Sequence, residues 1–182
     1  PTDDDTTGGV NIQAGAQYAE SLINALMYSP SWSDSALIFT YDEGGGFYDH
    51  VAPQPAAAPD SQTYPTDLSA GDQCDGVKAT TGICSFAMTG YRVPLIVISP
   101  FAKKNFVSHT VRDTTAWLNL VEERFGVPAL TARDAYWSTT TPVATMDEFF
   151  DFVNVPWATP PAQTSVPQQQ TNEPCSLAAP TP

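Results

Sequence analysis

The 182-residue sequence predicts an α/β fold with a layered sheet. Two short apolar runs, at residues 36–39 and 93–98, are typical of strands, and each lies next to a stretch with helical periodicity. Polar residues do not interrupt the first run, so we expect strands that are buried on both faces, as in a parallel sheet covered by helices. The order helix, strand, long loop, strand, helix favours this arrangement.

The first predicted helix spans residues 11–28, where apolar residues recur at helical spacing. Ser29-Pro30 ends it, because the residue before a proline is pushed out of helical geometry. The first strand follows within residues 35–41. Residues 44–91 show no periodicity and are rich in Pro, Ala, Gly, Asp and Thr, so we expect a long loop or lid insertion around a site.

The second strand is predicted within residues 93–98. A second helix is predicted over residues 110–125, because Thr110 and Asp113 have the spacing of a capping box, and Gly126 ends it. Two short helices should follow, since Thr131 with Asp134, and then Thr145 with Glu148, repeat the same start signal.

The last segment differs in composition from the rest. Residues 156–182 hold seven prolines, so we expect an extended or disordered tail. The chain therefore divides into a domain over residues 1–155 and a Pro-rich tail over residues 156–182.

The charge balance limits the partners. Twenty acidic and seven basic residues give a net charge of -13. Nucleic acid is excluded because a phosphate backbone needs a basic footprint, and the same charge would repel an anionic membrane surface. An acidic protein can still act on a phosphate ester when a bound cation inverts the local field.

The three cysteines suggest an oxidising compartment. Cys74 and Cys84 lie close together in a loop-like region, which favours a local disulfide over two free thiols. A zinc site is disfavoured, because no histidine or further cysteine lies nearby. Cys175 is left over, as a partner for a cysteine outside this chain.

The strongest chemical feature is the acidic pair Asp42-Glu43 at the end of the first predicted strand. Ligands bind at the carboxyl ends of strands in open α/β sheets. Hard cations take carboxylate oxygens, and phosphoryl transfer uses a cation. Three glycines follow, and then Asp49-His50 returns an acid and an imidazole to the same region. The alternative for the pair is a solvated strand end followed by a turn.

Both histidines of the chain follow predicted strands. His50 lies eight residues after Asp42, and His109 lies between the second strand and the second helix, from where it could approach the same face. The alternative for a lone loop histidine is a surface residue or a neighbour of a helix cap. No nucleophile stands out, and Ser108 beside His109 is no evidence of a triad, because adjacent residues rarely meet in the needed geometry.

Two blocks of sequence carry a family resemblance. The first includes Tyr41-Asp42-Glu43 and the run Gly45-Gly46-Phe47-Tyr48-Asp49-His50-Val51. The second includes Gly90-Tyr91-Arg92-Val93-Pro94, Ile98-Ser99-Pro100 and Val107-Ser108-His109-Thr110, and it closes at residues 130–135. Across residues 11–152 the chain resembles the family of phosphate-ester hydrolases that includes bacterial and fungal phospholipases C and acid phosphatases.

This resemblance implies an alkaline-phosphatase-like α/β/α sandwich, of which residues 1–155 are the C-terminal portion. It implies hydrolysis of a phosphate ester, with a phospholipid among the candidate substrates, at a divalent metal ion held by Asp42 and Glu43. His50 and His109 would orient groups or contact the phosphate. It also implies a secreted or periplasmic protein.

The chain departs from the family pattern in two ways. The family's N-terminal half, with a Glu-Asn metal-binding motif and a hydroxyl nucleophile, has no counterpart here, so that half is an expected partner. An acidic-His-Pro motif that usually precedes the first matched helix is replaced by residues 3–9. Two alternatives stay open: a non-catalytic fragment that lends metal ligands to a site completed elsewhere, and an acidic cation-binding domain without hydrolysis.

Overall fold

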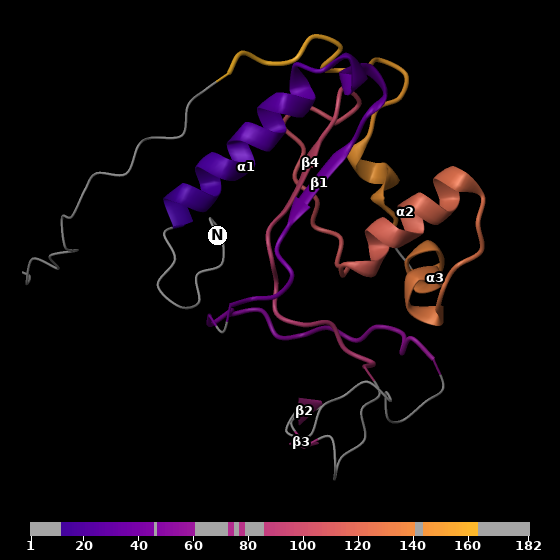
Figure 1. Ribbon diagram of the computed structural model, residues 1–182. Helices are drawn as coiled ribbons and strands as arrows, with labels where there is room; N and C mark the ends of the chain where they lie inside the picture. Colours follow the sequence, from indigo (N-terminus) through magenta and orange to yellow (C-terminus); the bar gives the residue numbers. More distant parts are fainter. Residues whose placement is uncertain are drawn as a thin grey trace, which may run out of the picture.

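The computed structural model describes residues 12–45, 47–60, 86–140 and 144–163, and the backbone of residues 73–74 and 77–78. In chain order the elements are α1 (Ile12–Met27), the 3₁₀ helix η1 (Pro30–Asp34), β1 (Leu37–Thr40), β2 (Gln73–Cys74), β3 (Val77–Lys78), β4 (Leu95–Ile98), α2 (Thr115–Phe125), α3 (Ala132–Thr139) and the 3₁₀ helix η2 (Met146–Phe149). Helix α1 lies on one side of the β1–β4 pair in Figure 1, and α2 and α3 lie on the other. The described part is thus a mixed helix and strand structure around a two-stranded sheet.

The predicted parallel sheet is wrong. Strands β1 and β4 pair antiparallel, with Leu37 opposite Ile98 and Thr40 opposite Leu95. A parallel pair needs a crossover that carries the chain back to the starting end of the sheet. Here the long connection leaves and re-enters the sheet at the same end (Figure 1), and its described residues contain no helix to make the crossover.

The predicted burial of both strand faces is also wrong. All four residues of β1 are only partly buried, and Ile96 of β4 is 51% exposed. Ile38, Leu95 and Val97 lie on the face that packs against the core. The two strands themselves lie inside the predicted ranges.

Helix α1 confirms the prediction over residues 11–28, and its stop signal has a second use. Ser29 caps η1, because its hydroxyl accepts a hydrogen bond from the backbone N–H of Ser31 at 3.2 Å. Pro30 then occupies the first turn, where its missing N–H costs nothing. One dipeptide therefore ends one helix and begins the next.

Helix α2 begins at Thr115 rather than at Thr110, so the predicted start is wrong. The hydroxyl of Thr110 is directed to Glu148, at 3.4 Å, and is not available as a cap. Asp113 performs the capping instead, because its Oδ1 accepts from the backbone N–H of Thr115 at 2.9 Å. The predicted end is confirmed, since Gly126 terminates the helix with φ 65°.

The two later start signals have different outcomes. Thr131 and Asp134 form the predicted capping box of α3. The Thr131 hydroxyl accepts from the backbone N–H of Asp134, and the Asp134 carboxylate accepts from the backbone N–H of Thr131. Thr145 precedes η2, which is a single 3₁₀ turn, and its side chain makes no capping hydrogen bond. Glu148 points away from this turn to partners before α2.

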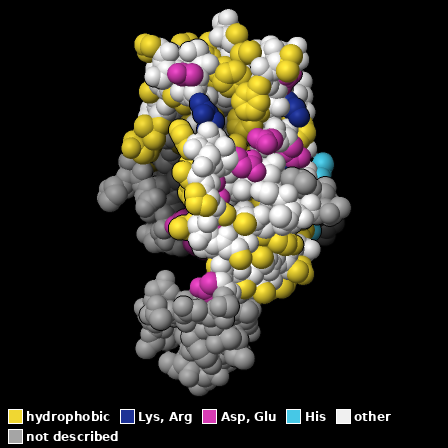
Figure 2. Space-filling view, turned by 90° about the vertical axis from the view of Figure 1, so that its right-hand side faces the viewer, with side chains coloured by type: hydrophobic (Ala, Val, Ile, Leu, Met, Phe, Trp, Pro, Cys, Tyr) yellow, Lys and Arg dark blue, Asp and Glu magenta, His cyan; other side chains and the backbone are white. Residues whose placement is uncertain are grey.

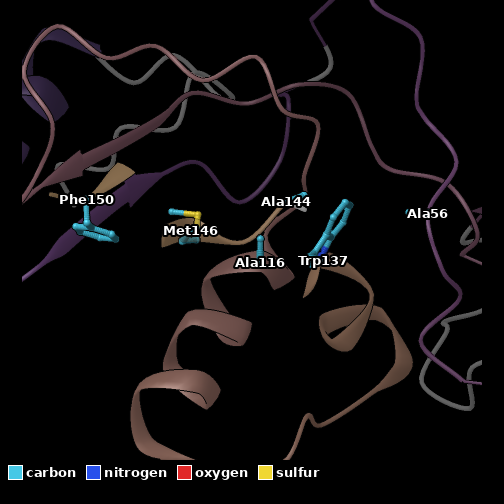
Figure 3. Close-up of a cluster of buried hydrophobic side chains, with 6 residues drawn as sticks. All are labelled: Ala56, Ala116, Trp137, Ala144, Met146 and Phe150. Carbon is cyan, nitrogen blue, oxygen red and sulfur yellow. The ribbon is translucent and has the colours of Figure 1, made fainter. Parts of the chain in front are cut away.

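The core connects the loop, the helices and the last turn (Figure 3). Its buried members are Ala56, Ala116, Trp137, Ala144, Met146 and Phe150. Trp137 donates from Nε1 to Thr115 Oγ1 at 2.7 Å and to Asp113 Oδ1 at 3.1 Å, so its indole is both packed and hydrogen-bonded. This cluster fixes α2 and α3 against the sheet.

The long loop and the tail are described in part. Within the described residues of the loop, β2 and β3 pair antiparallel, and a single bridge joins Pro55 to Met88. The start of the tail is tied down, because Trp32 donates from Nε1 to the carbonyl of Trp157 at 2.9 Å. The two-part domain division stays a prediction.

The predicted disulfide lies outside the described side chains, as does Cys175. Across the described ranges, every helix is too short or too polar to span a bilayer.

Candidate functional site

The acidic pair sits on a constrained turn directly after β1. Asp42 accepts at Oδ1 from the backbone N–H of Glu43 at 3.0 Å, and Glu43 accepts at Oε2 from the backbone N–H of Gly45 at 2.8 Å. Gly45 has φ 65°, a conformation that only glycine adopts without strain. Both carboxylates are exposed, and each keeps one oxygen without a partner among the described residues.

These two carboxylates match a hard divalent cation in chemistry but not in number. Such cations take about six oxygen ligands. Within the described part of the chain, no three His, Cys, Asp or Glu residues are grouped closely enough to hold a metal ion. Asp42 and Glu43 can therefore supply part of a coordination shell, and the remaining ligands must come from water, substrate or other parts of the protein.

Asp49 is committed to an ion pair with Arg92. The guanidinium donates from Nη2 to Oδ1 at 2.7 Å and from Nε to Oδ2 at 2.9 Å, a bidentate geometry. Backbone N–H groups of Val51 and Arg92 add two hydrogen bonds, both of 3.1 Å. The Arg92 side chain is the main reason that the pKa of Asp49 lies well below its usual range. Asp49 is therefore charged and structural, not a second proton donor at the site.

An open pocket of about 450 Å³ lies beside the acidic turn. Its lining residues are Gly44, Phe47, Tyr48, Asp49, Tyr91, Arg92, Val93 and Pro94. Three of these are exposed aromatic side chains, with Tyr48 92% exposed. Arg92 is also accessible, and its Nη1 has no hydrogen-bond partner among the described residues. The pocket thus offers the Nη1 amino group of a guanidinium, and aromatic surface, to an anionic ligand.

The two histidines lie in solvent. The side chain of His50 is 78% exposed, and its Nδ1 is 3.8 Å from Asp49 Oδ1, an oxygen that Arg92 already holds. His109 is exposed in the loop between β4 and α2. In Figure 2 the histidine colour appears only at one edge of the face shown, while acidic side chains gather nearer its middle.

The structure joins only part of the predicted set. Asp42 and Glu43 share one turn, and His50 lies next to the pocket-lining Asp49. Across the described residues, no hydrogen bond or ion pair connects His109 to either carboxylate or to His50. The assignment of these four residues to one site stays a prediction.

Sequence reasoning missed a network around His109. Glu148 accepts from the hydroxyl of Ser108 at 2.5 Å and forms an ion pair with Arg112. Burial alone would raise the pKa of Glu148, but hydrogen bonds from Ser108 and Arg112 outweigh it, so this pKa lies below its ordinary value. The sequence indicates Glu148 only as part of a helix-start signal, and no local signal links it to a loop 40 residues away.

A second missed group anchors the long loop. The buried side chain of Arg133 donates from Nε to Asp113 Oδ2 at 2.5 Å. The same guanidinium donates to the backbone carbonyls of Ala57 at 2.7 Å and Met88 at 2.9 Å. Arg133 thereby fixes both described segments of the loop to α3. One of these segments leads from the acidic turn, and the other leads to Arg92.

A family model described as the Phosphoesterase family matches residues 1–128. Phospholipase C B of Mycobacterium tuberculosis (strain ATCC 25618 / H37Rv) is 35% identical over 150 residues, which are 80% of this chain and 27% of that protein. Phospholipase C A of the same strain is 36% identical over 154 residues, covering 82% and 28%.

A plant protein shows the same relation. Non-specific phospholipase C1 of Arabidopsis thaliana is 31% identical over 142 residues, which are 71% of this chain and 24% of that protein. The chain thus spans about a quarter of the length of these curated relatives.

Proposed function

This chain belongs to the Phosphoesterase family, and we propose that the complete protein hydrolyses phosphate esters at a site to which this chain contributes. The names of the relatives favour a phosphodiester substrate, and a phospholipid in particular. The single observation that carries the proposal is the exposed carboxylate pair, Asp42 and Glu43, held on a glycine turn beside the pocket of Arg92.

Each residue of the proposed site has a distinct task. Asp42 and Glu43 hold a divalent cation with their free oxygens, and that cation, when bound, supplies charge neutralisation for the phosphoryl oxygens. Arg92 contacts a phosphate oxygen through Nη1, while Asp49 keeps the guanidinium in place. The exposed aromatic residues of the pocket contact the organic part of the ester.

Proton transfer falls to a histidine in this proposal. Asp49 is unsuited, because Arg92 holds its pKa well below the usual range. Imidazole is the side chain that changes charge near neutral pH, so His50 or His109 donates to the phosphate or protonates the leaving group. His50 is the nearer of the two to the pocket along the chain.

The test replaces the two carboxylates without changing their shape. Asp42→Asn, Glu43→Gln and the double variant of the complete protein would be assayed for bound divalent metal and for hydrolysis of a chromogenic phosphomonoester and a phosphocholine diester. We expect loss of metal and a fall in turnover of about 100-fold or more. Asp34→Asn, at an exposed position, is the control. Unchanged metal content and activity in Asp42→Asn would end the proposal.

A second candidate is a chain that supplies only part of a site. Two observations favour it. The described residues supply only two carboxylates to a metal ion, and the chain matches only about a quarter of the length of its relatives. Comparing the 182-residue chain with the complete protein, with and without divalent metal, separates the two. Turnover by the chain alone would exclude the partial site, whereas metal binding without turnover would support it.

A secreted or periplasmic location is part of the same proposal. It rests on the predicted bridge between Cys74 and Cys84, because disulfides persist in oxidising compartments. The mass of the intact protein after alkylation, with and without prior reduction, tests the bridge. Two alkylated thiols at these positions without reduction would contradict it.

A further inference from the structure

The hydroxyl of Ser108 is fully used. It donates to Glu148 Oε1 at 2.5 Å, and it accepts from the backbone N–H of Thr110 at 3.1 Å and from Arg112 Nη1 at 2.9 Å. A serine hydroxyl has one proton to donate and two lone pairs to accept. Its hydrogen-bonding capacity is therefore saturated within the protein.

Glu148 holds the chain on both sides of His109. Its Oε1 accepts from Ser108, and its Oε2 accepts from the hydroxyl of Thr110 at 3.4 Å. Arg112 completes the group with an ion pair to Oε1. We call these four residues, Ser108, Thr110, Arg112 and Glu148, the Glu148 clamp.

The clamp is anchored to the body of the protein. The Arg112 side chain is only 8% exposed and donates from Nε to the carbonyl of Ala144, a core residue, at 3.1 Å. Its guanidinium also lies over the ring of Phe149, 5.1 Å from the centroid. His109 is thus an exposed residue, and the residues on both sides of it are held by contacts to the core of the protein.

We infer that Glu148 and Ser108 are positioning residues that hold His109 for phosphate-ester hydrolysis, an inference that rests on the proposed function. A loop residue that must meet a transferring phosphoryl group needs its backbone fixed, because a displacement of about 1 Å can cost about 100-fold in rate. The clamp fixes both peptide neighbours of His109 and leaves its side chain free to reach a ligand.

The same contacts argue against Ser108 as the nucleophile. Attack on phosphorus needs a free lone pair on the hydroxyl oxygen, and both lone pairs of Ser108 accept N–H donors. The proton of Ser108 is held by Glu148 and not by His109. Under our inference, Ser108→Ala lowers turnover to about the level of Glu148→Gln, whereas loss of a nucleophile would abolish it.

The experiment is a double-mutant cycle in the complete protein. Glu148→Gln keeps the shape of the side chain and removes its charge, and Asp147→Asn, an exposed neighbour in the same turn, is the matched control. We expect Glu148→Gln to lower kcat by about 10- to 100-fold and Asp147→Asn to have no effect. In a His109→Ala background, Glu148→Gln should cost nothing more. An equal fold-loss in both backgrounds would overturn the inference.

A second measurement judges the clamp independently of activity. Hydrogen exchange of the Thr110 amide, which donates to Ser108, should become faster in Glu148→Gln than in Asp147→Asn. Unchanged exchange would overturn the clamp itself. Faster exchange, combined with full activity of His109→Ala, would instead remove His109 from the proposed function and overturn the positioning role.

Discussion

Glu122 and Asp134 share one backbone amide. Leu130 N donates to Glu122 Oε1 at 3.0 Å and to Asp134 Oδ2 at 2.7 Å, so two buried carboxyl groups meet at the loop between α2 and α3. Burial, with the contribution of Asp134, raises the pKa of Glu122. Burial also acts against charged Asp134, but hydrogen bonds from Thr131 and Glu122 hold its pKa below the usual value. Glu122 is therefore the member of the pair that takes up a proton first as the pH falls.

Replacing Glu122 with glutamine should weaken the pH dependence of stability. Because the pKa of Glu122 is raised in the folded state, its contribution is fully present below the ordinary glutamate pKa and is lost as pH rises through the folded-state pKa. Glutamine keeps a donor toward Asp134 and cannot ionise. The Tm of Glu122→Gln should thus fall less than that of the wild type between mildly acidic and neutral pH.

The control for this series is the exposed Asp34→Asn, whose Tm should follow the wild-type curve. A Glu122→Gln curve as steep as the wild-type one would show that folding does not raise the pKa of Glu122.

Gly126 and Gly90 allow the effect of backbone strain to be measured without a steric clash. A Cβ added at Gly126 or at Gly90 meets nothing within 4 Å, but only Gly126 has a positive φ, of 65°. Gly126→Ala should therefore destabilise the protein by about 1 kcal/mol through strain alone. Gly90→Ala should be neutral or slightly stabilising. Urea unfolding of both variants measures the difference, and equal free energies of unfolding would contradict the assignment of strain.

Three local signals in the sequence predicted local structure correctly, whereas the start signals at Thr110 and Thr145 did not. The periodicity of α1, the capping box at Thr131 and the stop at Gly126 each depend on residues within a few positions of one another. Such signals do not specify which segments meet. The antiparallel pairing of β1 with β4 depends on the path of the long connecting loop, and apolar runs alone do not encode that path.

The same distinction between local signals and long-range contacts applies to the candidate site. An acidic pair after an apolar run places Asp42 and Glu43 at a strand end from sequence alone. Arg92 pairs with a residue 43 positions away, and Glu148 pairs with one 40 positions away. Those contacts arise only when the chain is folded, so no spacing rule could have found them.

Arg133 should be among the most sensitive residues of this chain. Arg133→Met keeps the length of the side chain but leaves Asp113 without its guanidinium and three backbone carbonyls without a donor. Removing one partner of a buried ion pair costs about 3–5 kcal/mol. Chemical denaturation should show this loss, whereas Arg124→Met, at an exposed arginine without an ion pair in the described part, should change little. A loss below that of Arg124→Met would contradict the anchoring role.

Arg92 carries the last prediction, because it is the accessible cation of the pocket beside the acidic turn. Two of its guanidinium nitrogens hold Asp49, and Nη1 remains for a ligand oxygen. Arg92→Ala should weaken binding of inorganic phosphate to the complete protein about tenfold, the loss of one charge-assisted hydrogen bond. Arg92→Lys should bind with intermediate affinity, since one ammonium group cannot hold both carboxylate oxygens and a ligand.

Calorimetric titration with phosphate measures these affinities, with Arg124→Ala as a control for net charge. Because that control removes the same charge elsewhere, any general electrostatic effect should appear equally in both variants. If Arg92→Ala bound phosphate as tightly as Arg124→Ala, the guanidinium would have no part in anion recognition. The ion pair with Asp49 would then serve only to join the loop to β4.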